Sequence, residues 1–325
     1  MRERDVFGVL ADGREVERVR LAAGRLEASV LTWGATVQDL RLDGRSVVIG
    51  ADRLEPYLGD LLYTGALVGR FANRIGGARF TLDGETFHTD ANFRARHTLH
   101  GGSGGTGEQL WRLEGATETR ARLALDLPDG HMGFPGALAV AVIVSLEPPA
   151  TLRIAIEART SRATPCSFAH HGYFVLDDSG DIERHRLRVA ASRYLPVDND
   201  LIPTGEIADV AGTAFDFRAP RAIGGAGYDH NFCLDDGDGR LRDVARLESP
   251  ESGVSLTVST TEPGLQIYDG AHLLGARGFG GARLKARAGL AMETQAWPDS
   301  PNRADFPLCI LRPGSVYTSE TAYRF

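Results

Sequence analysis

Lysine is almost absent from this sequence, and cysteine is scarce. Lys285 is the one lysine among 36 basic residues, and no block of basic residues occurs along the chain. A chain with a net charge of −7 and no basic tract is a poor match for nucleic acid or an anionic membrane, so we expect neither as a partner. Cys166, Cys233 and Cys309 are scattered and fit no metal-binding or redox spacing. This pattern favours reduced, buried thiols in a cytoplasmic protein.

Long hydrophobic segments are also missing. The longest apolar run, residues 137–146, is too short to cross a bilayer. The first residues, MRERDVFGVL, lack the hydrophobic stretch of a signal peptide. No linker, repeat or low-complexity segment divides the chain, so we expect a single domain over residues 1–325.

Alternation of apolar and polar residues dominates the chain, whereas helical periodicity is scarce. Residues 152–156 alternate in this way, as a half-buried strand does. Asp-Gly pairs at 43–44 and 83–84 each separate two apolar runs, which is a strong hairpin signal. Residues 54–62 fit one short helix. With 39 glycines for turns, the sequence predicts an all-β fold, a large antiparallel β-sandwich.

One carboxylate stands out because of its neighbours in the sequence. Glu293 follows the apolar residues 290–292 and precedes residues 298–302, which contain two prolines that stiffen the chain. Apolar surroundings raise the pKa of a carboxyl group and make it a better proton acceptor. For a glutamate in isolation, the simpler alternative is a solvated residue at a strand end.

The histidines offer proton transfer or structural roles. His97 and His100 are three residues apart, but no third ligand stands at a suitable spacing, so we expect no metal site. The glycines at 101–102 allow a tight turn beside His100. His170 and His171 are adjacent, and successive strand residues face opposite sides, so at most one should enter a given pocket. The alternatives are turn, solvated or core histidines.

Four polar side chains are suited to binding hydroxyl groups. Asn73 and Arg74 offer an amide and a planar set of donors. Asp229 lies in a polar, aromatic turn, and Gln266 lies between apolar neighbours that should point the other way. A surface ion pair for Arg74 and an Asx-turn for Asp229 are the simpler alternatives. Together with Glu293 and the imidazoles, these groups suit proton transfer on a neutral, polyhydroxylated ligand.

The sequence resembles the aldose 1-epimerase family of the galactose mutarotase type, and the match runs nearly from end to end. The matching segments, in order, are GRFANRI (69–75), LHGG (99–102), DGHMGFPG (129–136), HHGYFVL (170–176), YLPVDNDLIPTGEI (194–207), GTAFDFR (212–218), GYDHNF (227–232), PGLQIY (263–268), METQAWPDSPN (292–302) and the closing residues 317–325. The ordered set is far more specific than any one segment.

The resemblance implies a galactose mutarotase-like β-supersandwich that interconverts the α and β anomers of free aldoses without a cofactor. By motif, Glu293 is the general base, His171 is the general acid, and His100 assists near the ring oxygen. The residues that the motifs assign to sugar hydroxyl groups are Asn73, Arg74, Asp229 and Gln266. The expected partner is a small-molecule aldose, and we expect a monomer or homodimer.

Three positions depart from the usual pattern of the family. His170 replaces the usual Asn before the catalytic histidine, residues 103–108 replace a Gly-Phe-rich loop, and Ala296-Trp297 replaces Asn-Phe. All three are candidates for a place near the sugar, so they bear on substrate preference rather than on the reaction.

Rival functions fit the sequence less well. A hexose-6-phosphate 1-epimerase of the related branch would carry a Pro/Trp/Phe-rich segment where GRFANRI stands. A non-catalytic sugar-binding or sensor module needs no acid–base pair. A glycoside hydrolase needs a second carboxylate across the bond, and the motif assigns the only nominee, Asp229, to hydroxyl binding.

Arg94 and Arg96 bear on the choice of sugar. In an extended segment they share a face with His100, which would bring two guanidinium groups to the pocket and favour anionic sugars. The simpler alternative, which we favour, is a solvated rim, because arginine is usually exposed.

Overall fold

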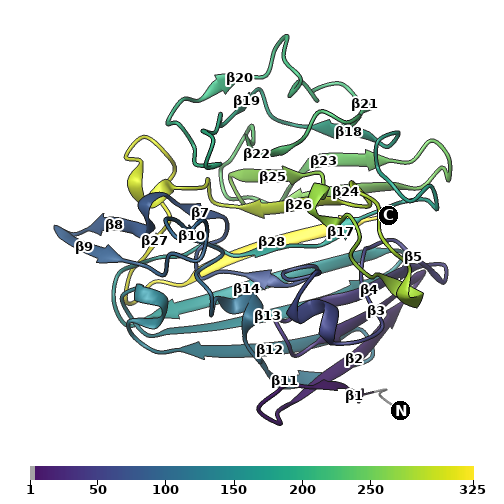
Figure 1. The fold of residues 1–325 in the computed structure, drawn as a ribbon, viewed down its shortest axis with the longest axis horizontal. Helices are drawn as coiled ribbons and strands as arrows, with labels where there is room; N and C mark the ends of the chain where they lie inside the picture. Colours follow the sequence, from purple (N-terminus) through teal and green to yellow (C-terminus); the bar gives the residue numbers. More distant parts are fainter. Residues whose placement is uncertain (1–3) are drawn as a thin grey trace.

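The computed structural model describes residues 4–325, which form three large antiparallel sheets (Figure 1). The first sheet has the order β1 (Arg4–Val9), β2 (Glu15–Ala23), β3 (Leu26–Leu31), β4 (Val37–Leu42) and β5 (Arg45–Ser46). The second has the order β11 (Arg112–Ala116), β12 (Arg120–Leu127), β13 (Leu138–Glu147), β14 (Thr151–Thr160), β28 (Tyr317–Arg324), β24 (Ser255–Thr260), β23 (Arg242–Glu248), β18 (Arg186–Val189) and β21 (Arg221–Ala222). The third has the order β17 (Tyr173–Phe174), β26 (Leu290–Gln295), β25 (Gly264–Tyr268), β22 (Asp229–Cys233), β19 (Arg193–Tyr194) and β20 (Ala208–Asp209).

Short elements link the large sheets. The paired strands are β6 (Leu67–Val68) with β16 (Ala169–His170), β7 (Arg74–Ile75) with β10 (Thr98–Leu99), β8 (Arg79–Leu82) with β9 (Glu85–His88), and β15 (Thr164–Pro165) with β27 (Ile310–Leu311). The helical segments within residues 4–325 are short 3-10 turns: η1 (Glu55–Leu58), η2 (Gly76–Ala78), η3 (Thr106–Glu108), η4 (His131–Gly133), η5 (Ala271–Leu273), η6 (Phe279–Gly281) and η7 (Ser300–Asn302). The expected helix over residues 54–62 was wrong in length, because Gly59 leaves the helical conformation at φ −150°. The all-β prediction is confirmed.

The two Asp-Gly hairpins form as the sequence predicts. β4 and β5 are joined through Asp43 and Gly44, whose φ angles are 50° and 83°. β8 and β9 are joined through Asp83 and Gly84, whose φ angles are 52° and 82°. Two successive positive φ angles match the right-handed twist of the flanking strands, and Asp-Gly tolerates them well.

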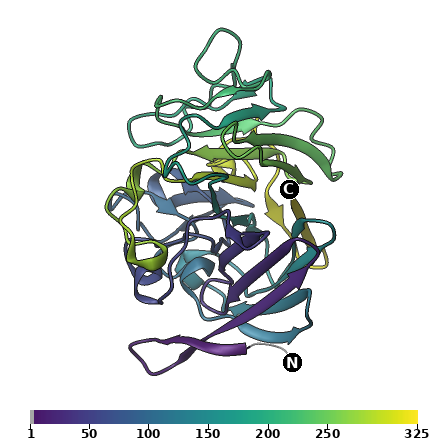
Figure 2. The same cartoon turned by 90° about the vertical axis from the view of Figure 1, so that its right-hand side faces the viewer.

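The main hydrophobic core cluster lies between the large sheets. Alternation along β13 buries Leu138, Val140, Val142 and Val144 and leaves the residues between them more exposed. The core cluster draws residues from all three large sheets. β28 pairs with β14 on one side and β24 on the other, so it crosses the middle of the molecule between the earlier and later strands (Figures 1 and 2).

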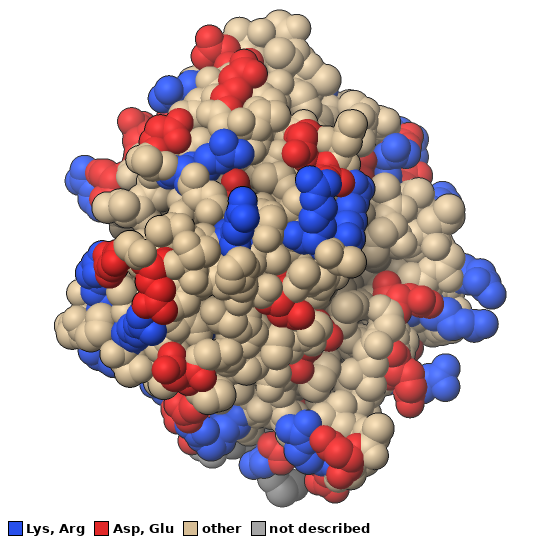
Figure 3. All heavy atoms as spheres, turned by 60° about the vertical axis from the view of Figure 1, so that its left-hand side comes forward, with Lys and Arg blue, Asp and Glu red and all other residues tan. Residues whose placement is uncertain are grey.

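Basic and acidic side chains are interspersed on the face shown in Figure 3. Exposed charged side chains form ion pairs, such as Arg25 with Asp43 and Arg312 with Asp83. None of the helical segments in the described part of the chain is long and apolar enough to cross a bilayer.

Candidate active site

The strand register of the third sheet brings three predicted site residues together. Glu293 on β26 lies directly opposite Gln266 on β25, and Gln266 lies opposite Asn231 on β22. Asp229 is two residues before Asn231, so both project from the same face of the strand. Glu293, Gln266 and Asp229 therefore share one face of the sheet, although up to 64 positions separate them in the chain.

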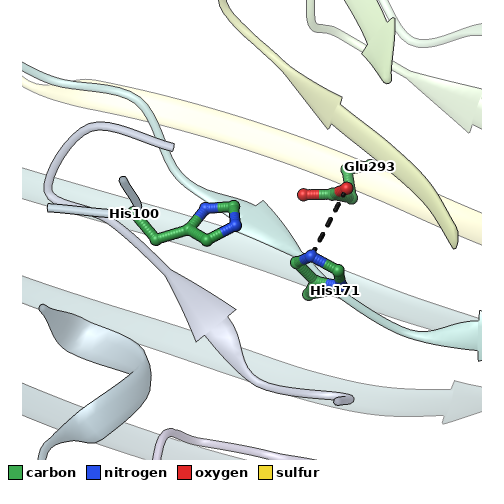
Figure 4. Close-up of side chains that lie close together, drawn as sticks. All are labelled: His100, His171 and Glu293. Carbon is green, nitrogen blue, oxygen red and sulfur yellow. Dashed lines mark ion pairs between the residues drawn. The ribbon is translucent and has the colours of Figure 1, made fainter. Parts of the chain in front are cut away.

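Glu293, His171 and His100 meet at this face (Figure 4). His171 lies just before β17, and its Nε2 is 3.6 Å from Oε1 of Glu293. That separation is longer than a hydrogen bond, so the two side chains are close to each other but are not hydrogen-bonded. The rings of His100 and His171 lie 5.2 Å apart, nearly edge to face. Glu293 is 2% exposed.

His100 has an uncommon backbone conformation and is held by two hydrogen bonds. His100 and Asn73 have positive φ angles of 51° and 64°, which are unusual outside glycine. The amide of His100 donates to the carbonyl of Asn73 at 2.9 Å, and the amide of Asn73 donates to Nδ1 of His100 at 3.1 Å. Because Nδ1 accepts, Nε2 carries the proton of the neutral ring, so His100 presents a donor to the site.

Asp229 is fixed by two neighbours. Nη2 of Arg74 donates to Oδ2 of Asp229 at 3.0 Å, and Nε2 of Gln266 donates to Oδ1 at 2.6 Å. The guanidinium of Arg74 also lies over the ring of Phe93, 4.8 Å from its centre. Contacts within the protein thus fix the side chains of Arg74, Asp229 and Gln266, and preorganised groups of this kind bind a ligand at a lower entropy cost.

Burial shifts the pKa values of Glu293, His171 and His100. It raises the pKa of Glu293 to about 8, with Asp229 adding to the rise and Arg74 opposing it. Burial lowers the pKa of His171 to about 4, and it holds the pKa of His100 well below its usual value. All three shifts favour the neutral form of the group, as expected for groups taken out of water. Burial therefore favours a proton on the carboxyl group of Glu293 over a proton on the imidazole of His171.

Several buried polar atoms of this site have no hydrogen-bond partner within residues 4–325. They are Nε of Arg74, Nδ1 of His171, Oε1 of Gln266, Oε2 of Glu293 and both amide atoms of Asn231. Buried polar groups in proteins are nearly always paired, so each of these needs a partner from outside the chain. A ligand with many hydroxyl groups supplies donors and acceptors together.

The structure separates the paired histidines. His171 enters the site, whereas His170 packs against Phe174 and Tyr323 on the other side. The prediction that only one of the two enters the pocket agrees with this arrangement. His97 lies apart from the site, where its ring accepts from the amide of Gly77.

A metal-binding arrangement appears where sequence spacing did not indicate one. Single ligand atoms of His100, His171 and Glu293 lie within 4.8 Å of one another. These residues come from three distant segments, so their proximity is invisible in the sequence. Two imidazoles and a carboxylate are suitable ligands for zinc. The same lone pairs would serve proton transfer, so the absence of a metal from the reaction stays a prediction.

The premise of the anionic-sugar hypothesis was wrong. Arg94 and Ala95 have positive φ angles of 53° and 52°, so the segment turns and is not extended. Arg94 and Arg96 both pair with Asp200, and their side chains are 48% and 71% exposed. They form the solvated rim that we favoured and link two loops at the surface.

One of the three departures from the family pattern touches the site. Glu108, in the loop after LHGG, accepts a 2.9 Å hydrogen bond from Tyr63, whose ring lies 4.9 Å from that of His100. His170 packs against Phe174 and Tyr323 in the core, so its bearing on substrate preference stays a prediction. Trp297 donates to the carbonyl of Pro263 at 3.0 Å and so braces the turn before β25.

Sequence reasoning missed some residues that shape the site. Tyr63 also stacks beside His171, with ring centres 6.5 Å apart, but its irregular loop carries no periodic signal. Asn231 had a usable signal, because the alternation of β22 puts it on the same face as Asp229.

A buried carboxyl group beside an imidazole, with unpartnered polar side chains around them on a β-sandwich, suits an enzyme that moves protons on a neutral, polyhydroxylated molecule. A family model described as aldose 1-epimerase matches residues 17–324. A galactose mutarotase from Mus musculus is 40% identical over 338 residues, covering 99% of this chain and 98% of the relative. An aldose 1-epimerase from Escherichia coli is 36% identical and covers 91% of each chain. The chain belongs to the aldose 1-epimerase family and is a carbohydrate isomerase.

Solved structures agree with the fold. An aldose epimerase homologue from C. elegans superposes with a TM-score of 0.89 at 27% identity, covering 95% of this chain and 98% of the other. A galactose 1-epimerase from Lactobacillus acidophilus superposes with a TM-score of 0.86 at 25% identity, covering 100% and 98%. The galactose mutarotase-like supersandwich is confirmed.

Proposed function

We propose that this aldose 1-epimerase interconverts the α and β anomers of free aldoses by proton transfer between Glu293, His171 and the sugar. The observation that carries the proposal is the 3.6 Å separation of Oε1 of Glu293 and Nε2 of His171. The C1 hydroxyl and the ring oxygen O5 are bonded to the same carbon atom. A base for one and an acid for the other must therefore converge on one point, as these two groups do.

Ring opening follows from these positions. Glu293 takes the proton of the C1 hydroxyl while His171 donates a proton to O5, and the C1–O5 bond breaks to give the open-chain aldehyde. Rotation about C1–C2 presents the other face of the carbonyl, and reclosure reverses both transfers. The donor Nε2 of His100 assists near O5. Positioned acid–base transfer supplies about 10²–10⁴-fold, and orientation adds to it.

The protonation of the pair agrees with this cycle. A neutral Glu293 carboxyl and a neutral His171 are the state that the pair reaches after ring opening, when the aldehyde is bound. Ring opening begins from the ionised pair, which the mutual attraction of carboxylate and imidazolium stabilises. Sugar hydroxyl groups that donate to the unpartnered Oε2 of Glu293 favour the ionised form further.

The hydroxyl groups that do not react are held beside the pair. We assign Asn73, Arg74, Asp229 and Gln266 to this role, because their polar atoms are ordered at one side of the acid–base pair. All seven proposed site residues come from one chain, so a monomer or homodimer suffices. The single-domain organisation is supported by the shared core, and a cytoplasmic location by three buried, unbonded cysteines.

Polarimetry on freshly dissolved α-glucose and α-galactose tests the function. Glu293→Gln and His171→Asn should each lower the enzymatic rate about 10²–10⁴-fold, while calorimetric titration still detects sugar binding. An unchanged rate in either variant would remove that residue from its assigned role. Loss of binding together with loss of rate would instead assign it to holding the sugar.

A further inference from the structure

Asn231 is a buried amide that the proposed mechanism does not use. Its side chain is 2% exposed, and neither Nδ2 nor Oδ1 has a hydrogen-bond partner in the described part of the chain. Leaving one buried polar atom unpaired costs about 1–3 kcal/mol, so an amide with two unpaired ends needs a partner from outside the chain. Asn231 lies directly opposite Gln266, which in turn lies opposite Glu293.

A missing side chain makes room for this amide. A Cβ atom at Gly264 would lie 2.6 Å from Oδ1 of Asn231 and 2.9 Å from Cδ1 of Trp297, closer than real contacts allow. Gly264 does not have a positive φ, so its backbone does not require glycine. Glycine is required at position 264 because any larger residue would overlap the side chain of Asn231. Gln295, opposite Gly264 in the register, is a second buried amide without a partner.

The amide of Asn231 borders the same small cavity as the proposed sugar-binding groups. The cavity has a volume of about 10 Å³, and its polar lining is Asn73, Arg74, Asp229, Asn231 and Gln266. That volume holds about one water-sized group, so it suits a single hydroxyl. An amide offers a donor and an acceptor, which together satisfy a hydroxyl that accepts and donates.

We propose that Asn231 is a specificity-determining residue that binds the C4 hydroxyl of the aldose, an inference that rests on the proposed function. Asn231, Gln266 and Glu293 stand on three successive strands, and adjacent strands lie about 4.8 Å apart. Asn231 is therefore two strands from the group that acts at C1. C4 lies across the pyranose ring from C1, and its hydroxyl is axial in galactose and equatorial in glucose.

The test compares Asn231→Leu with the wild-type enzyme on glucose, galactose and 3-deoxy-, 4-deoxy- and 6-deoxyglucose. Leucine has nearly the shape of asparagine but no polar atoms. Gln295→Leu is the matched control, because it removes the neighbouring unpartnered amide, which does not line the cavity. Polarimetry gives kcat and KM for each sugar, and thermal unfolding shows whether each variant is folded.

We expect Asn231→Leu to lower kcat/KM about 10- to 100-fold on sugars with a C4 hydroxyl, mainly through KM, as for a lost hydrogen bond to bound substrate. On 4-deoxyglucose the two enzymes should agree to about twofold. Gln295→Leu should affect every sugar equally. A uniform loss for Asn231→Leu would overturn the proposal and leave the amide a structural role. A loss that disappears with 3-deoxy- or 6-deoxyglucose would overturn the assignment to C4.

Failure of the proposed function is visible separately. In that case the wild-type enzyme would not accelerate mutarotation of any sugar above the spontaneous rate. Calorimetric titration with galactose and 4-deoxyglucose, which is also the 4-deoxy form of galactose, would then still test Asn231, since binding needs no turnover. Equal loss of affinity for both sugars in Asn231→Leu would overturn the contact.

Discussion

Replacing Glu293 with glutamine should remove activity and at the same time stabilise the fold. The wild-type carboxyl group is buried, and its pKa is raised from 4.5 to about 8. The folded protein therefore holds a proton that the unfolded chain releases. Because the folded-state pKa is the higher one, this stability is fully present below pH 4.5 and is lost as the pH rises towards 8. Glutamine does not titrate and escapes this loss.

The size of the effect follows from the two pKa values. Each unit of pH between them costs the wild-type protein about 1.4 kcal/mol. With the pKa values of 4.5 and about 8, Glu293→Gln should gain about 1 kcal/mol relative to the wild type at pH 5 and about 4 kcal/mol at pH 8. The N–H group that glutamine introduces changes the free energy of unfolding by the same amount at pH 5 and at pH 8. The increase of about 3 kcal/mol between the two pH values is therefore the part that burial of Glu293 predicts.

Urea unfolding of both proteins at pH 5 and pH 8 measures this difference, and polarimetry on the same samples measures activity. Glu262→Gln is the matched control: Glu262 is also buried with a raised pKa, and it accepts a 2.9 Å hydrogen bond from Tyr317 away from the site. That variant should keep its mutarotation rate. A stability difference for Glu293→Gln that is flat or falls between pH 5 and pH 8 would refute the view that Glu293 is protonated in the folded enzyme.

Three further outcomes are expected. A plot of the mutarotation rate against pH, with buffer catalysis subtracted, should be bell-shaped with limbs near pH 4 and pH 8. The reason is that the pair of His171 and Glu293 holds one proton only between those values. A flat profile from pH 4 to 9 would contradict a shared proton. Chelators should leave the rate unchanged in polarimetry, whereas a loss that zinc restores would assign a metal to His100, His171 and Glu293. Phe93→Leu should raise KM about 2- to 10-fold with little change in kcat, because it removes the ring beneath Arg74. Steady-state kinetics with Phe87→Leu as the control checks this, and an unchanged KM would show that Asp229 and Asn73 order Arg74 without the ring.

The pH limbs have a different origin from the one that the sequence indicates. From the residue types alone, the carboxylate belongs to the acid limb and the imidazole to the alkaline limb. Burial reverses the order, since it raises the pKa of Glu293 and lowers that of His171. The pair still holds one proton between the two pKa values, so the pH profile remains bell-shaped. His171 now accounts for the acid limb and Glu293 for the alkaline limb.

The β-sandwich was readable from the sequence because its signals are local. Alternation along residues 152–156 and the Asp-Gly turns depend on neighbours only, and they appear in β14 and the two hairpins as predicted. The ordered motifs also named residues that the structure brings together, Glu293, His171 and His100, although the roles of these residues stay predictions. The helix over residues 54–62 failed because one glycine at 59 ends it after a single turn.

What only the tertiary structure decided depends on distance and on burial. His100, His171 and Glu293 meet across nearly two hundred positions because strand pairing, not sequence spacing, sets their separation. The segment with Arg94 and Ala95 forms a turn, because both residues have positive φ angles, whereas the sequence alone predicted an extended segment. The protonation of Glu293 follows from the removal of water around it, which no local pattern of residue types records.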